Sequence, residues 1–299
     1  MILEYLQPDP DIWDGVAVVV RAGYYVASLG AAGLALFAIG YGHRLTPAEG
    51  DRLRARLAGA VGLAILLSLV AALVRVQILS AGDLANLAVW DAMLRSRVGD
   101  AAAIRIAGLL LLVPLAAGWR IGPALAGAGA LMVVASYAAM GHSMLYRPRQ
   151  EIAFVVVTHL AALSFWAGSL LPLAWVARRG DQAAALLVRD WSRAAMVAVG
   201  LLVASGAWGA VMLIQRADLV AGSWYGNGFV VKMLLVAIVF AFAAAHKFWL
   251  GLALERGEPG AGARLSTSIR FEILAMLLVF YAAAEMVSVH PVDVGHRVN

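Results

Sequence analysis

Long apolar stretches recur along the chain, and they restrict its fold more than any other feature. A helix needs about 20 consecutive, mainly apolar residues to cross the hydrocarbon core of a bilayer. Eight segments reach this length, near residues 16–42, 55–79, 101–119, 121–141, 151–177, 192–215, 228–253 and 267–289. The sequence therefore predicts an all-α, polytopic membrane helix bundle with about eight transmembrane helices.

The composition supports a membrane protein without a soluble domain. Hydrophobic residues make up 63% of the 299 residues and charged residues 14%, whereas a soluble domain is about half apolar and about a quarter charged. No polar run is long enough to form a core of its own. We therefore expect residues 1–299 to form a single integral membrane domain.

Loop arginines predict how the bundle is oriented. Cytoplasmic loops of membrane proteins are enriched in Lys and Arg, and one alternating set of loops holds twelve arginines while the other holds six. The larger set comprises Arg44, Arg52, Arg54, Arg56, Arg120, Arg178, Arg179, Arg189, Arg193, Arg256, Arg264 and Arg270. This set is expected to be cytoplasmic, which places both termini in the periplasm of a bacterium. The net charge of +5 then reflects topology and contact with the lipid bilayer, and does not indicate a nucleic-acid partner.

Two absences from the sequence limit its chemistry. The chain contains no cysteine, which excludes disulfides, iron–sulfur clusters and thiolate metal sites. A transition-metal site would therefore use His, Met, Asp, Glu or backbone oxygen. The sequence also has no Gly-x4-Gly-Lys-Ser/Thr motif, so ATP is not expected to drive a transport step.

A metal-binding motif is predicted in the loop after the fourth apolar segment. Met140-x-His142-x-Met144 places two thioethers beside an imidazole on the predicted outer side. Soft sulfur with imidazole suits copper, more as Cu(I) than as Cu(II). Met286 and His290 lie near the outer end of the last segment and are further candidate ligands. The alternative for each methionine is ordinary apolar packing in a membrane helix.

The fifth segment carries a histidine at depth. His159 lies about nine residues into this segment, and Trp166 follows seven residues later, about two helical turns, so both are expected on one face. His159 is a candidate copper ligand or relay. The alternative is a core histidine bonded to a neighbouring carbonyl or hydroxyl group. Trp166 is expected to pack.

The last two segments predict a polar stripe that runs inward. Lys232 and His246 are fourteen residues apart, nearly four whole turns, and are expected on one face of the seventh segment. Glu272 lies one turn into the eighth segment, and Met276 and Met286 follow it at +4 and +14 on the same side. Ionisable groups inside a membrane helix usually face a cavity or a partner.

Four further charged residues are expected to be structural. Arg21, Arg75 and Arg105 lie in the outer halves of the first three segments, where arginines snorkel or pair with acidic groups such as Asp100 or Glu285. Glu285 is expected on roughly the opposite side of its helix from Glu272, where a partnership with an arginine is favoured.

Six short motifs follow one another in the second half of the chain. They are Gly141-His142-Ser143, His159-x6-Trp166-x-Gly168-x-Leu170-x-Pro172, Trp191-Ser192-x2-Ala195, Tyr225-Gly226-x5-Lys232, His246-Lys247 and Arg270-x-Glu272. Their order and spacing resemble the copper resistance protein D family of bacterial inner-membrane proteins, with the family core over about residues 150–285. The resemblance implies copper handling, usually described as movement from periplasm to cytoplasm.

The chain departs from the family pattern in two respects. It has no attached periplasmic copper-binding domain, which some relatives carry, so delivery is expected to need free copper or a periplasmic copper-binding protein. His246 also stands where an asparagine-like residue is usual.

We therefore predict copper transport across the inner membrane, with two alternatives. One is a b-type haem protein for electron transfer, in which His142, His159, His246 and His290 would supply axial ligands, although no helix carries a histidine pair that a second helix repeats. The other is a non-transporting assembly factor that binds copper at the periplasmic face. An enzyme is least expected, since neither a serine–histidine–acid spacing nor paired carboxylates are present. The oligomeric state is left open.

Overall fold

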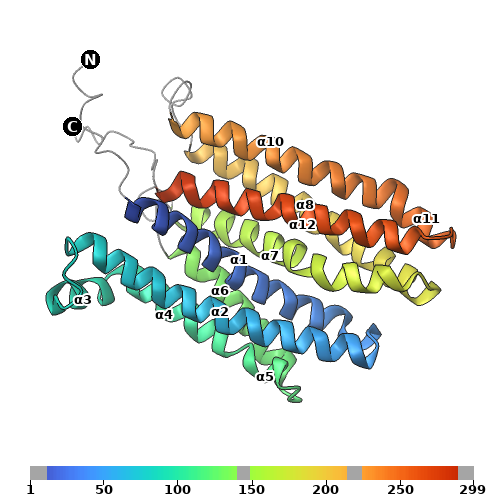
Figure 1. Cartoon of the computed structure of the whole chain (residues 1–299), viewed down its shortest axis with the longest axis horizontal. Coiled ribbons are helices and arrows are strands. Elements are labelled where there is room, and N and C mark those ends of the chain that lie inside the picture. Colours follow the sequence, from blue (N-terminus) through green and yellow to red (C-terminus); the bar gives the residue numbers. More distant parts are fainter. Residues whose placement is uncertain (1–11, 140–148, 214–223, 289–299) are drawn as a thin grey trace.

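The computed structural model describes residues 12–139, 149–213 and 224–288. The regular elements of these ranges are all helical (Figure 1). The longer helices are α1 (Ile12–Tyr41), α2 (Pro47–Leu79), α4 (Arg97–Leu110), α6 (Gly122–Ala138), α7 (Arg149–Arg179), α8 (Gln182–Leu213), α10 (Trp224–Ala245) and α12 (Ala261–Ser288). The shorter ones are the 3₁₀-helix η1 (Gly42–Arg44), α3 (Leu87–Leu94), α5 (Val113–Ala116), the π-helix η3 (His246–Leu250) and α11 (Gly251–Glu255).

The predicted all-α membrane bundle is confirmed. Seven helical segments within the described ranges are long and apolar enough to cross a bilayer, and α6 is a shorter apolar helix. The third segment is broken where α4 ends and α5 begins, next to Pro114, because proline cannot donate a backbone hydrogen bond within a helix. The long helices run back and forth along one common direction (Figure 1). Eight crossings remain a prediction.

Ion pairs join helix ends at the arginine-rich end of the bundle. Arg179, the last residue of α7, lies 3.3 Å from Glu49 of α2 and 3.0 Å from Asp181, the residue before α8. The Arg179 guanidinium holds the pKa of the Asp181 carboxyl below its ordinary value. Arg44 lies 2.6 Å from Asp190 of α8. The arginines that predict the cytoplasmic side thus also join the α1–α2 hairpin to the α7–α8 hairpin, although exposed pairs contribute only about 0–1 kcal/mol each.

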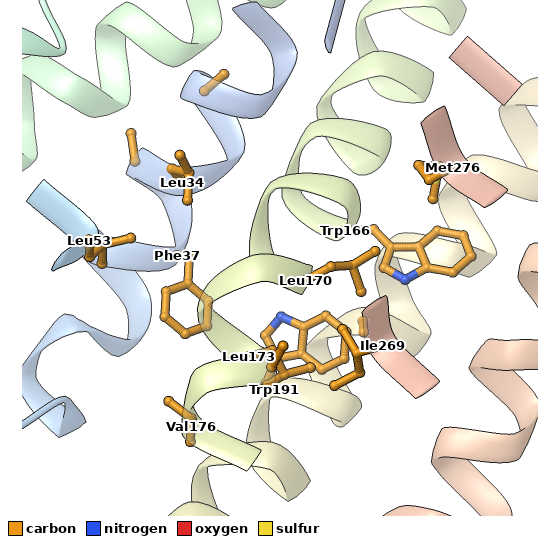
Figure 2. Packing of buried hydrophobic residues seen from close by; sticks show 14 of the residues in the cluster. Leu34, Phe37, Leu53, Trp166, Leu170, Leu173, Val176, Trp191, Ile269 and Met276 are labelled. Carbon is orange, nitrogen blue, oxygen red and sulfur yellow. The ribbon is translucent and has the colours of Figure 1, made fainter. Parts of the chain in front are cut away.

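Helix α7 lies at the centre of the bundle and packs against α1, α6, α8 and α12. Figure 2 shows this region, where Leu170 and Leu173 of α7 lie between Phe37 of α1 on one side and Ile269 of α12 on the other. Helix α10 packs mainly against α12, and its apolar window is the least buried of the seven candidate spans. The position of α7 brings it into contact with both halves of the chain.

Two pairs of helices cross at glycines. A Cβ atom on Gly33 of α1 would lie 1.8 Å from the Ser164 carbonyl oxygen and 2.8 Å from the Gly168 Cα atom of α7. A Cβ atom on Gly108 of α4 would lie 2.8 Å from the Gly129 carbonyl oxygen of α6. Small residues let membrane helices approach closely, where packing rather than the hydrophobic effect stabilises the contact. Gly33 therefore makes a close helix contact within the chain, whereas a Cβ atom on Gly30 would meet nothing within 4 Å.

Arg105 has a different environment from the expected one. Its side chain is only 3% exposed, and its guanidinium carbon lies 4.9 Å from the Tyr24 ring centre and 4.4 Å from that of Tyr137. Its Nε donates to the Ser136 hydroxyl at 3.3 Å. Snorkelling is thus wrong for Arg105, which is buried between aromatic faces that attract a cation. The sequence around Arg105 does not predict these aromatic contacts, because the two tyrosines lie on other helices, α1 and α6.

The other three predicted structural charges lie nearer the surface. Arg75 is exposed on α2, which fits snorkelling, and Arg21 is half-buried on α1. Glu285 is half-buried on α12, and its Oε2 lies 3.5 Å from the position that a Cβ atom on Gly228 of α10 would take. Met286 reaches the same glycine. Glu285 therefore also faces α10 and is not confined to the side opposite the polar stripe.

Replacing Arg105 by methionine is expected to lower the thermal stability of the protein. The substitution keeps an unbranched chain but removes two cation–π contacts, each worth about 1–2 kcal/mol when buried, so a loss of about 2–4 kcal/mol is expected. Thermal unfolding in detergent measures it. The matched control is Arg75→Met on the exposed face of α2, which should unfold near the wild-type temperature. Equal unfolding temperatures for both variants would contradict the structural role of Arg105.

Candidate functional site

Few ionisable groups lie within the second half of the bundle. Helix α7 carries none between His159 and Arg178, and the stretch formed by α10 and η3 carries none between Lys232 and His246. On α12, Glu272 is the only one between Arg270 and Tyr281. Such groups are costly inside a membrane helix and mark functional positions. The structure places these four predicted residues at two levels of the bundle.

His159 lies at the level farther from the arginine-rich end of the bundle, which is named the outer level after the predicted orientation. Its Nδ1 lies 3.2 Å from the Leu202 carbonyl oxygen and 3.3 Å from the Ser205 hydroxyl, both on α8. A carbonyl oxygen only accepts, so the neutral ring holds its proton on Nδ1 and keeps a lone pair on Nε2. Metal-binding histidines are commonly oriented by this kind of hydrogen bond from the nitrogen that does not bind the metal. The predicted bond of His159 to a neighbouring carbonyl or hydroxyl group is thus confirmed, and its role as a copper ligand or relay stays a prediction.

A glycine on α8 makes room for the His159 ring. A Cβ atom on Gly206 would lie 3.2 Å from His159 Cε1 and 3.4 Å from Nδ1. On the same helix, a Cβ atom on Gly209 would lie 3.5 Å from Val155 of α7. Gly206 and Gly209 therefore let α8 pack closely against α7, and the imidazole reaches the Leu202 carbonyl.

Lys232 of α10 lies near this level. It is half-buried, and it is close enough for its charge to act on His159. A positive charge there weakens the binding of a cation. This is compatible with a transport site, which must bind an ion and then release it.

Glu272, His246 and Ser268 form the inner level. Glu272 is fully buried, and its Oε2 lies 3.1 Å from His246 Nδ1. The other ring nitrogen, Nε2, lies 2.8 Å from the Ser268 hydroxyl. Within the described part of the chain, neither Glu272 oxygen makes a hydrogen bond of standard geometry. The carboxyl group is therefore enclosed, with the His246 imidazole within 3.1 Å of it.

Other predicted residues surround this inner group. The Trp166 indole of α7 interacts with Glu272 and stacks on Phe240 of α10, with ring centres 5.8 Å apart and planes 8° apart. Met276 is buried (Figure 2) and follows Glu272 by four residues, about one turn, on α12. Trp166 packs, as predicted, but it also lies against the buried acid. The distance from His159 to Trp166 along α7 is seven residues, or about 10 Å.

A π-helix places His246 at this point. Residues His246–Leu250 form the wider helical turn η3 between α10 and α11. Single π-turns within longer helices are frequent at functional sites, because the extra residue turns side chains out of the α-helical register. The sequence carries no signal for this turn, and Ser268 is also missed by sequence reasoning, although it precedes Glu272 by one helical turn on α12.

The predicted outer capture site lies largely outside the described residues. Met140, His142, Met144 and His290 all fall there. Met286 is buried, and its Sδ lies 3.9 Å from the position of a Cβ atom on Gly228 of α10. Among the residues that the structure describes, no three His, Asp or Glu side chains gather in a metal-binding cluster. Among the candidate ligands that the structure describes, His159 has a ring nitrogen, Nε2, with no hydrogen-bond partner in the described residues.

Replacing Gly206 by a larger residue is expected to impair the predicted copper transport without unfolding the protein. In Gly206→Val, the side chain occupies the space of the imidazole ring and breaks its bond to Leu202, so copper uptake should fall at least tenfold. The matched control is Gly200→Val on the same helix, where an added Cβ atom meets nothing within 4 Å. Uptake by vesicles with equal amounts of each variant is the measurement. Equal rates for both variants would refute the role of the His159 orientation.

Comparisons with known families cover most of the chain. The family model described as copper resistance protein D matches residues 185–286. A second model, described as copper resistance protein D-like, N-terminal domain, matches residues 11–146. A search of curated proteins found no significant match. The same holds for a search of solved structures. The two family matches fall on α8 to α12 and on α1 to α6, and α7 with His159 and Trp166 lies between them.

Proposed function

The chain belongs to the copper resistance protein D family, and from this premise we propose that it moves copper across the bacterial inner membrane, from periplasm to cytoplasm. The family and the apolar helices make it a copper-resistance-related, multi-pass membrane protein. The observation that carries the transport proposal is the fixed orientation of His159 inside the bundle. Its Nδ1 is held by α8, while its Nε2 keeps a lone pair and has no hydrogen-bond partner within the described ranges.

The proposed route has an outer and an inner part. Copper, as Cu(I) rather than Cu(II), is captured by Met140, His142 and Met144, with Met286 or His290 as further ligands. It then passes to His159, which lies about ten residues from the first residue of α7, or about 15 Å along the axis. Thioether and imidazole groups suit Cu(I) and hold it less firmly than thiolates would.

The inner part lies between α7, α10 and α12. Trp166, Phe240 and Met276 line the step from the His159 level toward the cytoplasmic end. The inside-negative membrane potential favours cation entry by about 2.3 kcal/mol per charge and 100 mV. Such a passive or potential-driven flow requires neither an ATP-binding motif nor enzymatic turnover.

Copper uptake into sealed proteoliposomes tests the proposal. The purified protein should admit Cu(I) at a rate well above that of protein-free liposomes, and an inside-negative potential should raise the rate. Copper that binds to the outer face but never enters the lumen would instead identify an assembly factor that delivers copper without transporting it. A periplasmic copper-binding protein can be added as donor in the same assay.

The haem alternative gains no support from the described histidines. An axial ligand needs a free ring nitrogen that faces the iron. Both nitrogens of His246 have close polar neighbours, since Nδ1 lies at Glu272 and Nε2 lies at Ser268. His159 at the other level offers a single ring nitrogen, Nε2, so the described histidines of the bundle do not supply the two axial ligands of a bis-histidine haem. A visible spectrum of the purified protein without a Soret band is therefore expected.

A further inference from the structure

Glu272, His246 and Ser268 are arranged in a row along which a proton can pass. Three side chains follow one another from the buried interior toward the arginine-rich end: the Glu272 carboxyl, the His246 imidazole at 3.1 Å and the Ser268 hydroxyl at 2.8 Å. Ser268 also lines a hollow of about 430 Å³ together with Ala263, Arg264, Thr267 and Phe271 of the first turns of α12. Chains of Asp, Glu and His side chains carry protons in membrane pumps and transporters, and a serine hydroxyl can both accept and donate a hydrogen bond.

We propose that Glu272 exchanges a proton with the cytoplasmic side through His246 and Ser268 each time a copper ion passes. This inference rests on the proposed transport of copper through the second half of the bundle. Glu272 acts as a counter-charge that forms when the carboxyl group loses its proton. It does not act as a copper ligand, because its hard carboxylate oxygens suit Cu(I) poorly. The carboxylate offsets the charge of the passing ion, and the returning proton neutralises the group afterwards.

The burial of Glu272 explains why a proton is needed. The carboxyl group is fully enclosed and its oxygens lack hydrogen bonds of standard geometry among the described residues. A full negative charge in such a place is costly unless a cation is near. Hence the group holds a proton when the path is empty and ionises when the copper ion arrives.

The transfer is balanced along the three groups. The Glu272 O–H gives its proton to His246 Nδ1 while the Nε2–H of the same ring gives its proton to Ser268 Oγ. The Ser268 hydroxyl proton passes to water in the hollow. The result is a Glu272 carboxylate, a neutral imidazole, a neutral hydroxyl and one proton released. The reverse sequence restores the starting state after the copper ion leaves, so no net proton crosses the membrane.

Few other charged groups surround this path. Lys247 of η3 is adjacent in sequence to His246, Glu255 of α11 is exposed, and Arg264 and Arg270 lie on the exposed side of α12. On the remaining elements packed against α12, α1 carries no ionisable residue between Tyr25 and Tyr41, α7 none between His159 and Arg178, and α10 none between Lys232 and its end. Among the residues that the structure describes, Glu272 and His246 are therefore the titratable pair that these helices place at this level.

Infrared difference spectroscopy on the purified full-length protein tests the path. Addition of Cu(I) under anaerobic conditions should remove the carbonyl stretch of one protonated carboxyl group in the wild type, and Glu272→Gln should lack this change. Rapid mixing should show the loss at least fivefold more slowly in Ser268→Ala. The matched control is Ser266→Ala, since Ser266 is buried two residues away on α12 and bonds to none of the three groups.

The outcomes separate this inference from the transport proposal. A copper-induced carboxyl signal that persists in Glu272→Gln would overturn the proton path, and so would its absence from wild-type protein that takes up copper into vesicles. Equal rates in Ser268→Ala and Ser266→Ala would overturn the exit through Ser268, even if Glu272→Gln fails to fold. Failure of the wild type to take up copper would instead refute the transport proposal.

Discussion

Replacing Gly33 by leucine is expected to leave little or no folded protein. The Cβ atom alone would lie 1.8 Å from the Ser164 carbonyl oxygen and 2.8 Å from the Gly168 Cα atom. These are backbone atoms that no rotamer change can move, so α1 and α7 have to separate. A destabilisation of about 5 kcal/mol or more is expected, which is comparable with the whole stability of many domains. Size-exclusion chromatography of the detergent-solubilised protein measures the folded fraction.

Gly30 provides the matched control for Gly33. It lies three residues earlier on α1, and an added Cβ atom meets nothing within 4 Å. Gly30→Leu should therefore elute and unfold like the wild type. If Gly33→Leu behaves as Gly30→Leu does, α1 and α7 do not cross at Gly33 and Gly168, and the central position of α7 is wrong. The effect is large because α7 packs against helices of both halves.

Replacing His159 by alanine is expected to reduce copper uptake to the level of empty liposomes. The substitution removes the imidazole whose Nε2 is proposed to bind copper. The Ser205 hydroxyl of α8 stays satisfied, because it donates to the Leu201 carbonyl at 2.5 Å. The fold should survive, because the ring is half-buried and the Gly206 surface faces only its edge. Uptake of Cu(I) by proteoliposomes containing equal amounts of protein is the measurement.

His43→Ala is the control for the loss of an imidazole as such. His43 is exposed in η1 at the arginine-rich end, away from the proposed route. Its replacement should leave uptake unchanged. Wild-type uptake in His159→Ala would show that copper does not need this residue and would move the route elsewhere in the bundle.

The helical fold could be predicted because its signal is local. An apolar run of about 20 residues specifies a membrane-spanning helix by its length alone, and the segments near 16–42 or 151–177 correspond to α1 and α7. The π-turn at His246 and the break before Pro114 alter a helix by one or two residues. Such changes lie below the precision with which apolar length marks a boundary.

The site was harder to predict because its partners are distant in the sequence. His159 stood out as a titratable residue at depth, but the Leu202 carbonyl that orients it is 43 residues away and belongs to the backbone. The aromatic faces around Arg105 come from α1 and α6, so the sequence predicts only snorkelling or an acidic partner for this residue. Only helix packing decides which of these groups meet.

X-ray absorption of bound copper tests the central claim most directly. The purified protein is loaded with Cu(I) under anaerobic conditions, and the copper spectra of the wild type and His159→Ala are compared at equal protein concentration. The account predicts imidazole scattering in the wild type, with the loss of one imidazole and of bound copper in His159→Ala. An unchanged spectrum and unchanged copper content in the variant would show that copper does not bind at His159, and would contradict the account.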